Sequence, residues 1–296
     1  LRDNFNPFAL NFMKGGIVYS NYFNTVSPHH AWEAHHTDVS YGLGHTIHTH
    51  QHKFGGILNG IDYNIWNPEV DSYIPFRYNK DDLASKEKNK KALRERLLLR
   101  DVDKPIVAFI GRLDPQKGVH LVHHAMYYAL NRNAQFVLLG SATEAGINSQ
   151  FWHEKQHLND NPDCHLEIGF NEELAHLIYA GADIMVVPSN YEPCGLTQII
   201  GLKYGAVPVV RGVGGLVDTV FDKDYDTTQP PEKRNGFVFY ESDNHALESA
   251  LERAIGLWHY FPAEFEKLQT QGMAWDFSWN NPGQEYLNVY EMIRHR

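Results

Sequence analysis

Short apolar runs rich in β-branched residues alternate with longer amphipathic segments along the chain from residue 105 onward. This alternation is typical of βαβ units, in which helices cover both faces of a parallel sheet. The predicted strands occupy residues 106–110, 136–139, 166–168, 184–187, 207–210 and, more weakly, 237–239. The predicted helices lie near residues 119–130, 149–158, 172–180 and 196–204. The sequence therefore predicts an α/β fold with a doubly wound parallel sheet, and such sheets bind ligands at the carboxyl ends of their strands.

Segments outside this alternation are predicted from spacing and turn residues. Residues 80–101 are highly charged and have helical spacing, so we expect a solvated helix or a linker leading into the sheet. The apolar side of this segment would be formed by Leu93, Leu97 and Leu98. Residues 223–234 contain Asp-Thr-Thr-Gln-Pro-Pro and are predicted to be a loop. Residues 282–293 place apolar and aromatic side chains on one face of a helix.

Charge, hydropathy and cysteine content exclude several classes of protein. The chain has 26 Lys and Arg against 36 Asp and Glu, a net charge of −10, which argues against a nucleic-acid partner. No apolar run approaches the ~20 residues that span a bilayer, so no membrane insertion is expected. The two cysteines, Cys164 and Cys194, are too few for a disulfide framework and favour a reducing compartment. The chain begins Leu-Arg-Asp-Asn, and we expect a fragment or a processed product.

Two cations follow the first predicted strand of the sheet. Arg112 and Lys117 lie in the segment Gly-Arg-Leu-Asp-Pro-Gln-Lys-Gly, directly after residues 106–110. Cations spaced in this way across a strand-to-helix turn can converge on one anionic group, and a diphosphate suits an Arg fork and a compact Lys charge. The same spacing also fits a polar turn whose Arg and Lys are merely solvated.

A second polar segment, Pro-Ser-Asn-Tyr-Glu-Pro-Cys-Gly-Leu-Thr-Gln, follows the strand predicted at residues 184–187. Gly195, Leu196 and Thr197 would open the next helix, where free N–H groups and the helix dipole favour an anion. Glu192, just before them, could accept hydrogen bonds from sugar hydroxyls or stabilise developing positive charge. Alone, the segment also fits a capping turn. Together with the Arg112–Lys117 turn, it predicts a phosphate site with a carboxylate beside it.

Three other sequence features give weaker evidence for a functional site. The segment Gly-Val-Gly-Gly-Leu at residues 212–216 fits either a close ligand approach or a tight turn, and it lacks the spacing of a dinucleotide fingerprint. Histidines are dense between His29 and His52, but no Cys or acidic cluster completes a familiar ligand set, so a metal site is not favoured. Cys194 has no evident His partner and fits a small buried thiol better than a nucleophile.

These motifs resemble the starch synthases and bacterial glycogen synthases of glycosyltransferase family five. The resemblance covers nearly all 296 residues and is most specific where R-L-x-x-Q-K-G is combined with E-P-C-G-L-T-Q. Within the family, the chain looks most like the type III/IV plant and cyanobacterial branch. The motifs that carry the resemblance lie at residues 53–68, 111–118, 191–198, 201–218 and 273–279.

The resemblance implies a GT-B fold, in which two Rossmann-like domains face each other across a cleft. Residues 1–75 would be the tail of the N-terminal acceptor domain and the hinge, and residues 76–275 the donor-binding domain. Residues 276–296 would form a helix that crosses back to the N-terminal domain. The family's N-terminal Lys-x-Gly-Gly-Leu loop is absent from this chain, and Gly111 and Val213 replace residues that often carry a hydroxyl.

The resemblance also implies roles for individual residues. Arg112 and Lys117 would hold the donor's phosphates and neutralise the departing ADP, while Glu192 would contact the transferred glucose. The donor-binding set would comprise Asn59 at the sugar, Phe170 against adenine, the backbone at Gly195, Leu196 and Thr197 at the diphosphate, and Cys194 beside them. Preorganised charges of this kind lower the barrier to glycosyl transfer electrostatically.

The activity implied is retaining transfer of glucose from ADP-glucose to the non-reducing end of an α-1,4-glucan such as starch, glycogen or malto-oligosaccharide. No cofactor and no metal are expected. The compartment would be the plastid stroma in a plant or alga and the cytoplasm in a bacterium. A non-catalytic module that binds ADP-glucose or glucan is the alternative. A nicotinamide oxidoreductase would share only the fold class and would require the missing glycine fingerprint.

Overall fold

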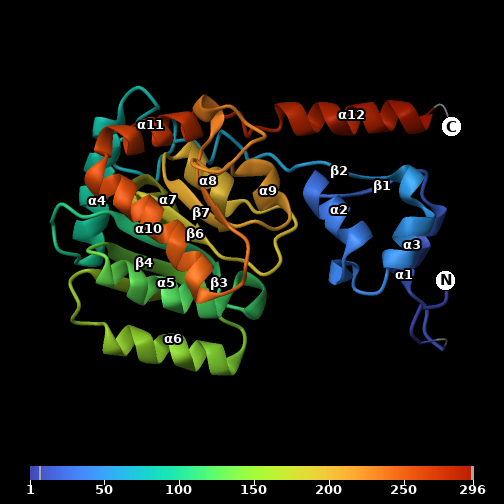
Figure 1. Cartoon of the computed structure of the whole chain (residues 1–296), viewed down its shortest axis with the longest axis horizontal. Coiled ribbons are helices and arrows are strands. Elements are labelled where there is room, and N and C mark those ends of the chain that lie inside the picture. Colours follow the sequence, from blue (N-terminus) through green and yellow to red (C-terminus); the bar gives the residue numbers. More distant parts are fainter. Residues whose placement is uncertain (7, 295–296) are drawn as a thin grey trace.

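The computed structural model describes residues 1–6 and 8–294. Its main feature is a parallel sheet of six strands in the order β5-β4-β3-β6-β7-β8 (Figure 1). The strands are β3 (Ile106–Arg112), β4 (Gln135–Ser141), β5 (Cys164–Ile168), β6 (Ile184–Val187), β7 (Val207–Arg211) and β8 (Phe237–Phe239). Every strand predicted from the sequence is confirmed. The four inner strands are buried on both faces of the sheet, whereas the edge strands β5 and β8 alternate buried with partly buried residues.

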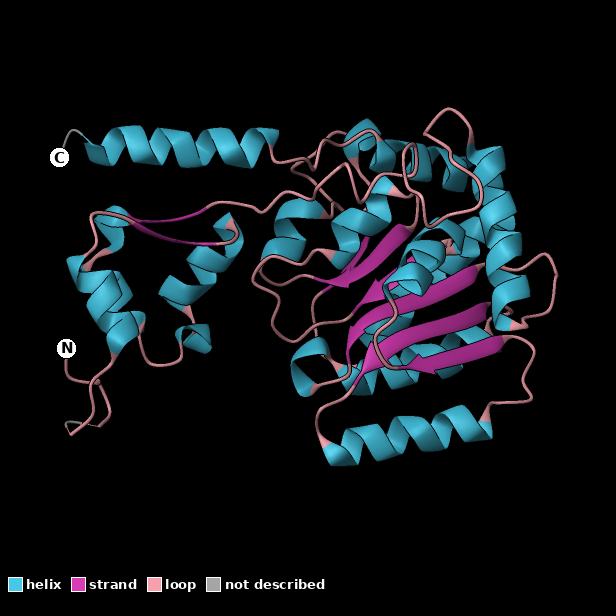
Figure 2. Cartoon of the chain, turned by 180° about the vertical axis from the view of Figure 1, so that it is seen from behind, coloured by secondary structure: helices cyan, strands magenta, loops and turns pink. Residues whose placement is uncertain are grey.

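Helices cover both faces of this sheet (Figure 2). One apolar cluster joins the sheet to α5 (Val119–Asn131), α6 (Ala145–His157), α10 (Asn244–Tyr260) and α11 (Pro262–Met273). The other joins it to α4 (Leu83–Leu97), α7 (Glu172–Gly181) and α8 (Thr197–Lys203). The doubly wound α/β fold is therefore confirmed, and we refer to residues 83–273 as the sheet domain.

The expectation of a solvated helix at residues 80–101 is wrong. In α4 the side chains of Lys86, Lys90 and Arg94 are buried. The Lys86 ammonium donates to the carbonyls of Ala180 and Ala182 at 3.0 and 2.8 Å, where α7 ends. Cations at a helix C-terminus satisfy its free carbonyls and interact favourably with the dipole, so these charges attach α4 to the sheet domain.

The apolar side predicted for the same segment is correct only in part. Leu93 and Leu97 are buried, whereas Leu98 is 88% exposed. Leu98 caps α4 in the left-handed conformation at φ 58°, which turns it away from the helix face that carries the other two leucines. Residues 223–234 form the predicted loop apart from one turn of 3-10 helix, Pro231–Lys233.

Residues 1–6 and 8–56, here called the N-terminal segment, lie beside the sheet domain (Figure 1). The segment contains a two-stranded parallel sheet of β1 (Phe23–Thr25) and β2 (Phe54–Gly56). Its helices are α1 (Phe12–Tyr19), α2 (Pro28–His36) and α3 (Gly44–Thr49). The buried apolar cluster is small, comprising Ile17, Ala34, Leu43 and Ile47.

The chain runs twice between the sheet domain and the N-terminal segment, and the two crossings touch. The Ile61 amide donates to the Phe277 carbonyl at 2.8 Å, and a Cβ on Gly60 would lie 2.6 Å from the Ser278 backbone. The last helix, α12 (Asn280–Arg294), then extends toward the N-terminal segment, where the Tyr286 hydroxyl lies 3.2 Å from the Asn24 amide (Figures 1 and 2). The predicted helix at residues 282–293 is confirmed, while the domain limits at residues 75 and 275 stay a prediction.

Within the described part of the chain, none of the helices has the length and apolar character needed to cross a membrane.

Candidate functional site

Two polar loops meet at the carboxyl ends of the neighbouring strands β3 and β6. We call residues 111–118 the cation loop and residues 188–198 the carboxylate loop. The Asn190 amide donates to the Gln116 carbonyl at 2.8 Å, and the Gln116 side chain donates to the Tyr191 carbonyl at 3.1 Å. The two loops predicted to share one edge of the sheet are therefore bonded to each other rather than separated by solvent.

Lys117 and Glu192 form the centre of this site. The Lys117 ammonium lies 2.5 Å from Glu192 Oε2, and the Ser189 hydroxyl donates to the same oxygen at 2.8 Å. Glu192 is buried, with 6% of its surface exposed. A Cβ on Gly118, at φ +67°, would lie 2.1 Å from the Pro188 carbonyl oxygen, so only glycine permits this close approach of the loops.

Arg112 does not join the Lys117–Glu192 pair. It ends β3 with an exposed side chain, and its guanidinium bonds to Asp114 Oδ2 at 2.8 Å and to Gln116 Oε1 at 3.1 Å. Asp114 also caps the single turn of 3-10 helix Pro115–Lys117 by accepting from the Lys117 amide at 3.0 Å. The convergence of Arg112 and Lys117 on one diphosphate therefore stays a prediction.

The carboxylate loop continues into α8, which begins at Thr197. Gly195 adopts φ +72°, and Leu196 is the residue that caps the helix. The side-chain amide of Gln198 donates to the carbonyls of Cys194 and Gly195 at 3.2 and 2.8 Å. The turn predicted at the start of this helix is thus present, and Gln198 holds its backbone.

Asn59 and Cys194 are brought together beside the carboxylate loop. Burial raises the pKa of the Cys194 thiol, although a hydrogen bond from the Asn59 backbone opposes this effect. A thiol with a raised pKa is a poor nucleophile, which agrees with the interpretation of Cys194 as a small buried side chain.

Phe170 lies apart from these residues. It follows the edge strand β5, which is separated from β3 by β4, and its side chain is 88% exposed. An exposed aromatic ring at a strand end is available for stacking on a flat base, so its predicted contact with adenine stays open to test.

The glycine loop, residues 212–216, packs behind the carboxylate loop. A Cβ on Gly214 would lie 2.0 Å from the Glu192 carbonyl oxygen, and one on Gly215 would lie 2.1 Å from that of Cys194. The Gly215 amide donates to the Glu192 carbonyl at 3.0 Å. Of the two interpretations given for these glycines, the structure supports the tight turn. The turn packs against the backbone of the carboxylate loop and thereby positions Glu192.

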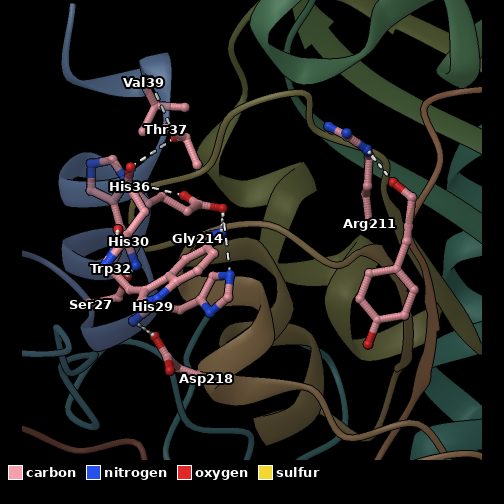
Figure 3. A network of polar contacts seen from close by, with 12 residues as sticks. Ser27, His29, His30, Trp32, His36, Thr37, Val39, Arg211, Gly214 and Asp218 are labelled. Carbon is pink, nitrogen blue, oxygen red and sulfur yellow. Dashed lines mark hydrogen bonds and ion pairs between the residues drawn. The ribbon is translucent and has the colours of Figure 1, made fainter. Parts of the chain in front are cut away.

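The N-terminal segment contacts the carboxylate loop and the glycine loop through α2 and the residue that caps it (Figure 3). The sequence did not predict this contact. The Ser27 hydroxyl donates to the Pro193 carbonyl at 2.6 Å, and the Gly214 amide donates to Glu33 Oε1 at 2.9 Å. Burial raises the pKa of Glu33, but hydrogen bonds from His30 and the Gly214 amide outweigh it, so the pKa lies below its usual value. The His30 ring also lies 3.1 Å from the Tyr191 hydroxyl.

The dense histidines form a chain rather than a cage. One ring nitrogen of His35 lies 3.1 Å from His36, and the other lies 2.9 Å from His48. Because the two nitrogens of His35 face different partners, the three rings do not converge on one point. Across residues 1–6 and 8–294, no group of three or more His, Cys, Asp or Glu is placed to hold a metal ion.

Comparison with known proteins identifies the family. The family model described as "Glycosyl transferases group 1" matches residues 89–264, which include both loops of the site. The chain belongs to the group 1 glycosyl transferases. A second model, "Starch synthase catalytic domain", matches residues 3–49 in the N-terminal segment.

Individual relatives agree with this assignment. The chain is 71% identical over 296 residues to glycogen synthase 1 of Trichormus variabilis, covering all of this chain and 60% of that protein. It is 69% identical to a probable glycogen synthase 2 of Synechocystis, again covering 60% of the relative. The catalytic domain of starch synthase IV from Arabidopsis thaliana, bound to ADP and acarbose, superposes with a TM-score of 0.94 at 41% identity, covering 97% of this chain and 58% of that one.

The resemblance to starch and glycogen synthases and the GT-B fold are therefore confirmed. The chain spans about 60% of the length of these curated relatives.

Proposed function

We propose that this chain supplies the donor-binding part of a retaining glucosyltransferase that moves glucose from ADP-glucose to the non-reducing end of an α-1,4-glucan. The observation that carries the proposal is the contact between Lys117 and Glu192 at the carboxyl ends of β3 and β6. One cation and one carboxylate, side by side at a strand edge, match a reaction that develops charge of both signs.

In this reaction, the bond between the anomeric carbon and the diphosphate oxygen breaks, the acceptor hydroxyl oxygen forms the new bond to that carbon, and its proton passes to the departing diphosphate. Lys117 and Arg112 would stabilise the negative charge that develops on the departing ADP. Glu192 would stabilise positive charge near the anomeric carbon. Held in place before the reaction, these groups need little reorganisation when the charges form.

The donor and acceptor classes rest on the relatives. The Arabidopsis starch synthase IV structure is bound to ADP and acarbose, which supports an adenine nucleotide and a carbohydrate as ligands. We further propose that the two cations act without a metal ion. A bacterial cytoplasm is favoured over a plastid because the named relatives at about 70% identity are bacterial.

The test separates binding from turnover. ADP and ADP-glucose binding to the chain would be measured by calorimetry. Transfer to malto-oligosaccharide would be measured in a chimera with the part of the Trichormus variabilis enzyme that the chain does not match. Lys117→Ala and Glu192→Ala should each lower turnover by about 10²- to 10³-fold. Lys155→Ala, which removes a cation paired with Glu167 on α6 and β5, should leave it unchanged.

The outcomes distinguish the alternatives. Turnover resistant to a metal chelator would support metal-independent transfer, and loss of turnover on chelation would contradict it. Binding of ADP-glucose by the chain without transfer by the chimera would favour the non-catalytic module. Rates equal to wild type in both Lys117→Ala and Glu192→Ala would remove the site assignment.

A further inference from the structure

Asp114 contacts both cationic positions of the cation loop. Its Oδ2 lies 2.8 Å from the Arg112 guanidinium, and its Oδ1 accepts from the Lys117 amide at 3.0 Å. The Asp114 side chain is 17% exposed, whereas that of Arg112 is 61% exposed. The Asp114 carboxylate is thus paired with the same guanidinium that, in the proposed function, binds the donor's diphosphate.

The charge of Asp114 is not needed for its structural role. Asp114 caps the turn Pro115–Lys117, and a neutral Asn or Ser accepts the same capping hydrogen bond about as well. Gln116, which is uncharged, already holds the other side of the guanidinium at 3.1 Å. The additional effect of a carboxylate here is therefore electrostatic, and it falls on Arg112 and on any anion that approaches it.

We propose that Asp114 sets the affinity of the site for nucleoside diphosphates by competing with the diphosphate for Arg112. A diphosphate that binds Arg112 must displace Asp114 or lie beside it, and like charges in such proximity repel. Asp114 thereby weakens the binding of both ADP-glucose and ADP and favours release of the product. This inference rests on the proposed function, because it takes Arg112 to be a ligand of the diphosphate.

The experiment is calorimetric titration of the whole chain with ADP. Asp114→Asn keeps the cap and removes the charge, and it should tighten ADP binding by roughly three- to fivefold, the scale of an exposed ion pair. The gain should shrink with salt, since the screening length falls from about 10 Å at 0.1 M to about 3 Å at 1 M. Asp114→Ser, which also caps, should behave in the same way.

Two controls isolate the mechanism. Asp82→Asn removes the same charge from another capping aspartate, at the start of α4, and should leave ADP affinity unchanged. In an Arg112→Ala background, Asp114→Asn should bring little gain, because the carboxylate then has no guanidinium to occupy.

The possible failures are distinguishable. If wild type binds ADP and Arg112→Ala weakens binding, but Asp114→Asn binds as wild type does or more weakly, the inference about Asp114 is overturned while the donor site stands. A full gain retained in the Arg112→Ala background also overturns it, since the effect would not act through Arg112. If wild type does not bind ADP, or neither Arg112→Ala nor Lys117→Ala weakens binding, the proposed function itself fails.

Discussion

The sheet domain and the N-terminal segment both support the carboxylate loop, but they do so by different means. The sheet domain carries apolar clusters on both faces of its sheet, and the loop leaves directly from the buried strand β6. The N-terminal segment has a much smaller cluster and reaches the same loop through polar contacts of α2 and its N-cap, from the cap residue Ser27 to Pro193 and from His30 to Tyr191.

This difference indicates which region of the molecule makes the site rigid. Burial of apolar surface is the dominant stabilising contribution in folding, so the sheet domain can hold Lys117 and Glu192 in place without help. A few polar contacts contribute less each and are more easily broken. We therefore expect the sheet domain to determine the stability of the site and the N-terminal segment to adjust the carboxylate loop.

The largest expected effect comes from the core of the sheet domain. Phe136 in β4 is fully buried, and Phe136→Ala should lower the free energy of unfolding by about 3–5 kcal/mol, measured by chemical denaturation. Phe12→Ala is the matched control, because this phenylalanine in α1 is 81% exposed and its removal should change stability by less than about 0.5 kcal/mol. Equal losses in the two variants would contradict the contrast between the regions.

The next effect tests the packing of the glycine loop against the carboxylate loop. Gly215→Ala would place a Cβ 2.1 Å from the Cys194 carbonyl oxygen, and the backbone must move to relieve the overlap. We expect a loss of about 1–3 kcal/mol in thermal or chemical unfolding, together with weaker ADP binding. Gly283→Ala in α12 meets no atom within 4 Å and should not destabilise the chain. A stable Gly215→Ala variant with normal ADP affinity would show that this contact does not position Glu192.

Much of the sheet domain could be predicted because its signal is local. The apolar runs of the four inner strands, which are buried on both faces, are continuous in sequence, and the runs of the edge strands β5 and β8 are short but apolar enough to predict all six. Helix α10 was missed although Leu247, Leu251 and Ile255 repeat at helical spacing, a signal that a systematic count would detect. The burial of Lys86 could not be predicted, because its partners are carbonyls 94 and 96 residues away.

The site was predictable to a similar extent. Positions directly after neighbouring parallel strands share one edge of the sheet, so the meeting of the cation and carboxylate loops follows from the strand pattern. The contact between Glu33 and the Gly214 amide joins residues 181 apart, and a single polar contact of this kind leaves no periodic trace in the sequence. The Asp114–Arg112 pair is predictable from the sequence, since the two residues lie two positions apart in the same polar segment.

A smaller effect on stability is expected when only the contact between the N-terminal segment and the glycine loop is weakened. Glu33→Gln retains an acceptor for the Gly214 amide but removes the charge, which should weaken this contact by about 1 kcal/mol. Hydrogen exchange should then accelerate in α2 and leave β3 and β4 unchanged. Glu285→Gln on α12, which is exposed, is the control. Faster exchange throughout the sheet strands would contradict independent behaviour of the two regions.

The same contact has a predicted pH dependence. The pKa of Glu33 is held below 4.5, its ordinary value, so the stabilisation is fully present above that pH and is lost only as the pH falls through the lower value in the folded chain. Protection of the α2 amides in the wild type, measured relative to the intrinsic exchange rate at each pH, should therefore remain high at pH 4.5 and fall below it. In Glu33→Gln this step should be absent, and an equal step in both proteins would assign it to another group.

The smallest expected effect is on the reactivity of the two cysteines. Their labelling rates show whether β5 in the sheet domain and the carboxylate loop open together or separately. Cys164 lies in β5 and Cys194 in the carboxylate loop. Burial raises the pKa of Cys194, and burial with the nearby Asp163 raises that of Cys164 to about 12. Only the thiolate reacts with iodoacetamide. Between pH 7 and pH 9, both cysteines should therefore be labelled far more slowly than a free thiol with a pKa of about 8.5.

The two variants described above should change these labelling rates differently. Glu33→Gln should accelerate labelling of Cys194 alone, whereas Phe136→Ala should accelerate labelling of both cysteines. Mass spectrometry of the labelled peptides measures each rate, and acceleration of Cys164 by Glu33→Gln would mean that the N-terminal segment stabilises the whole sheet domain.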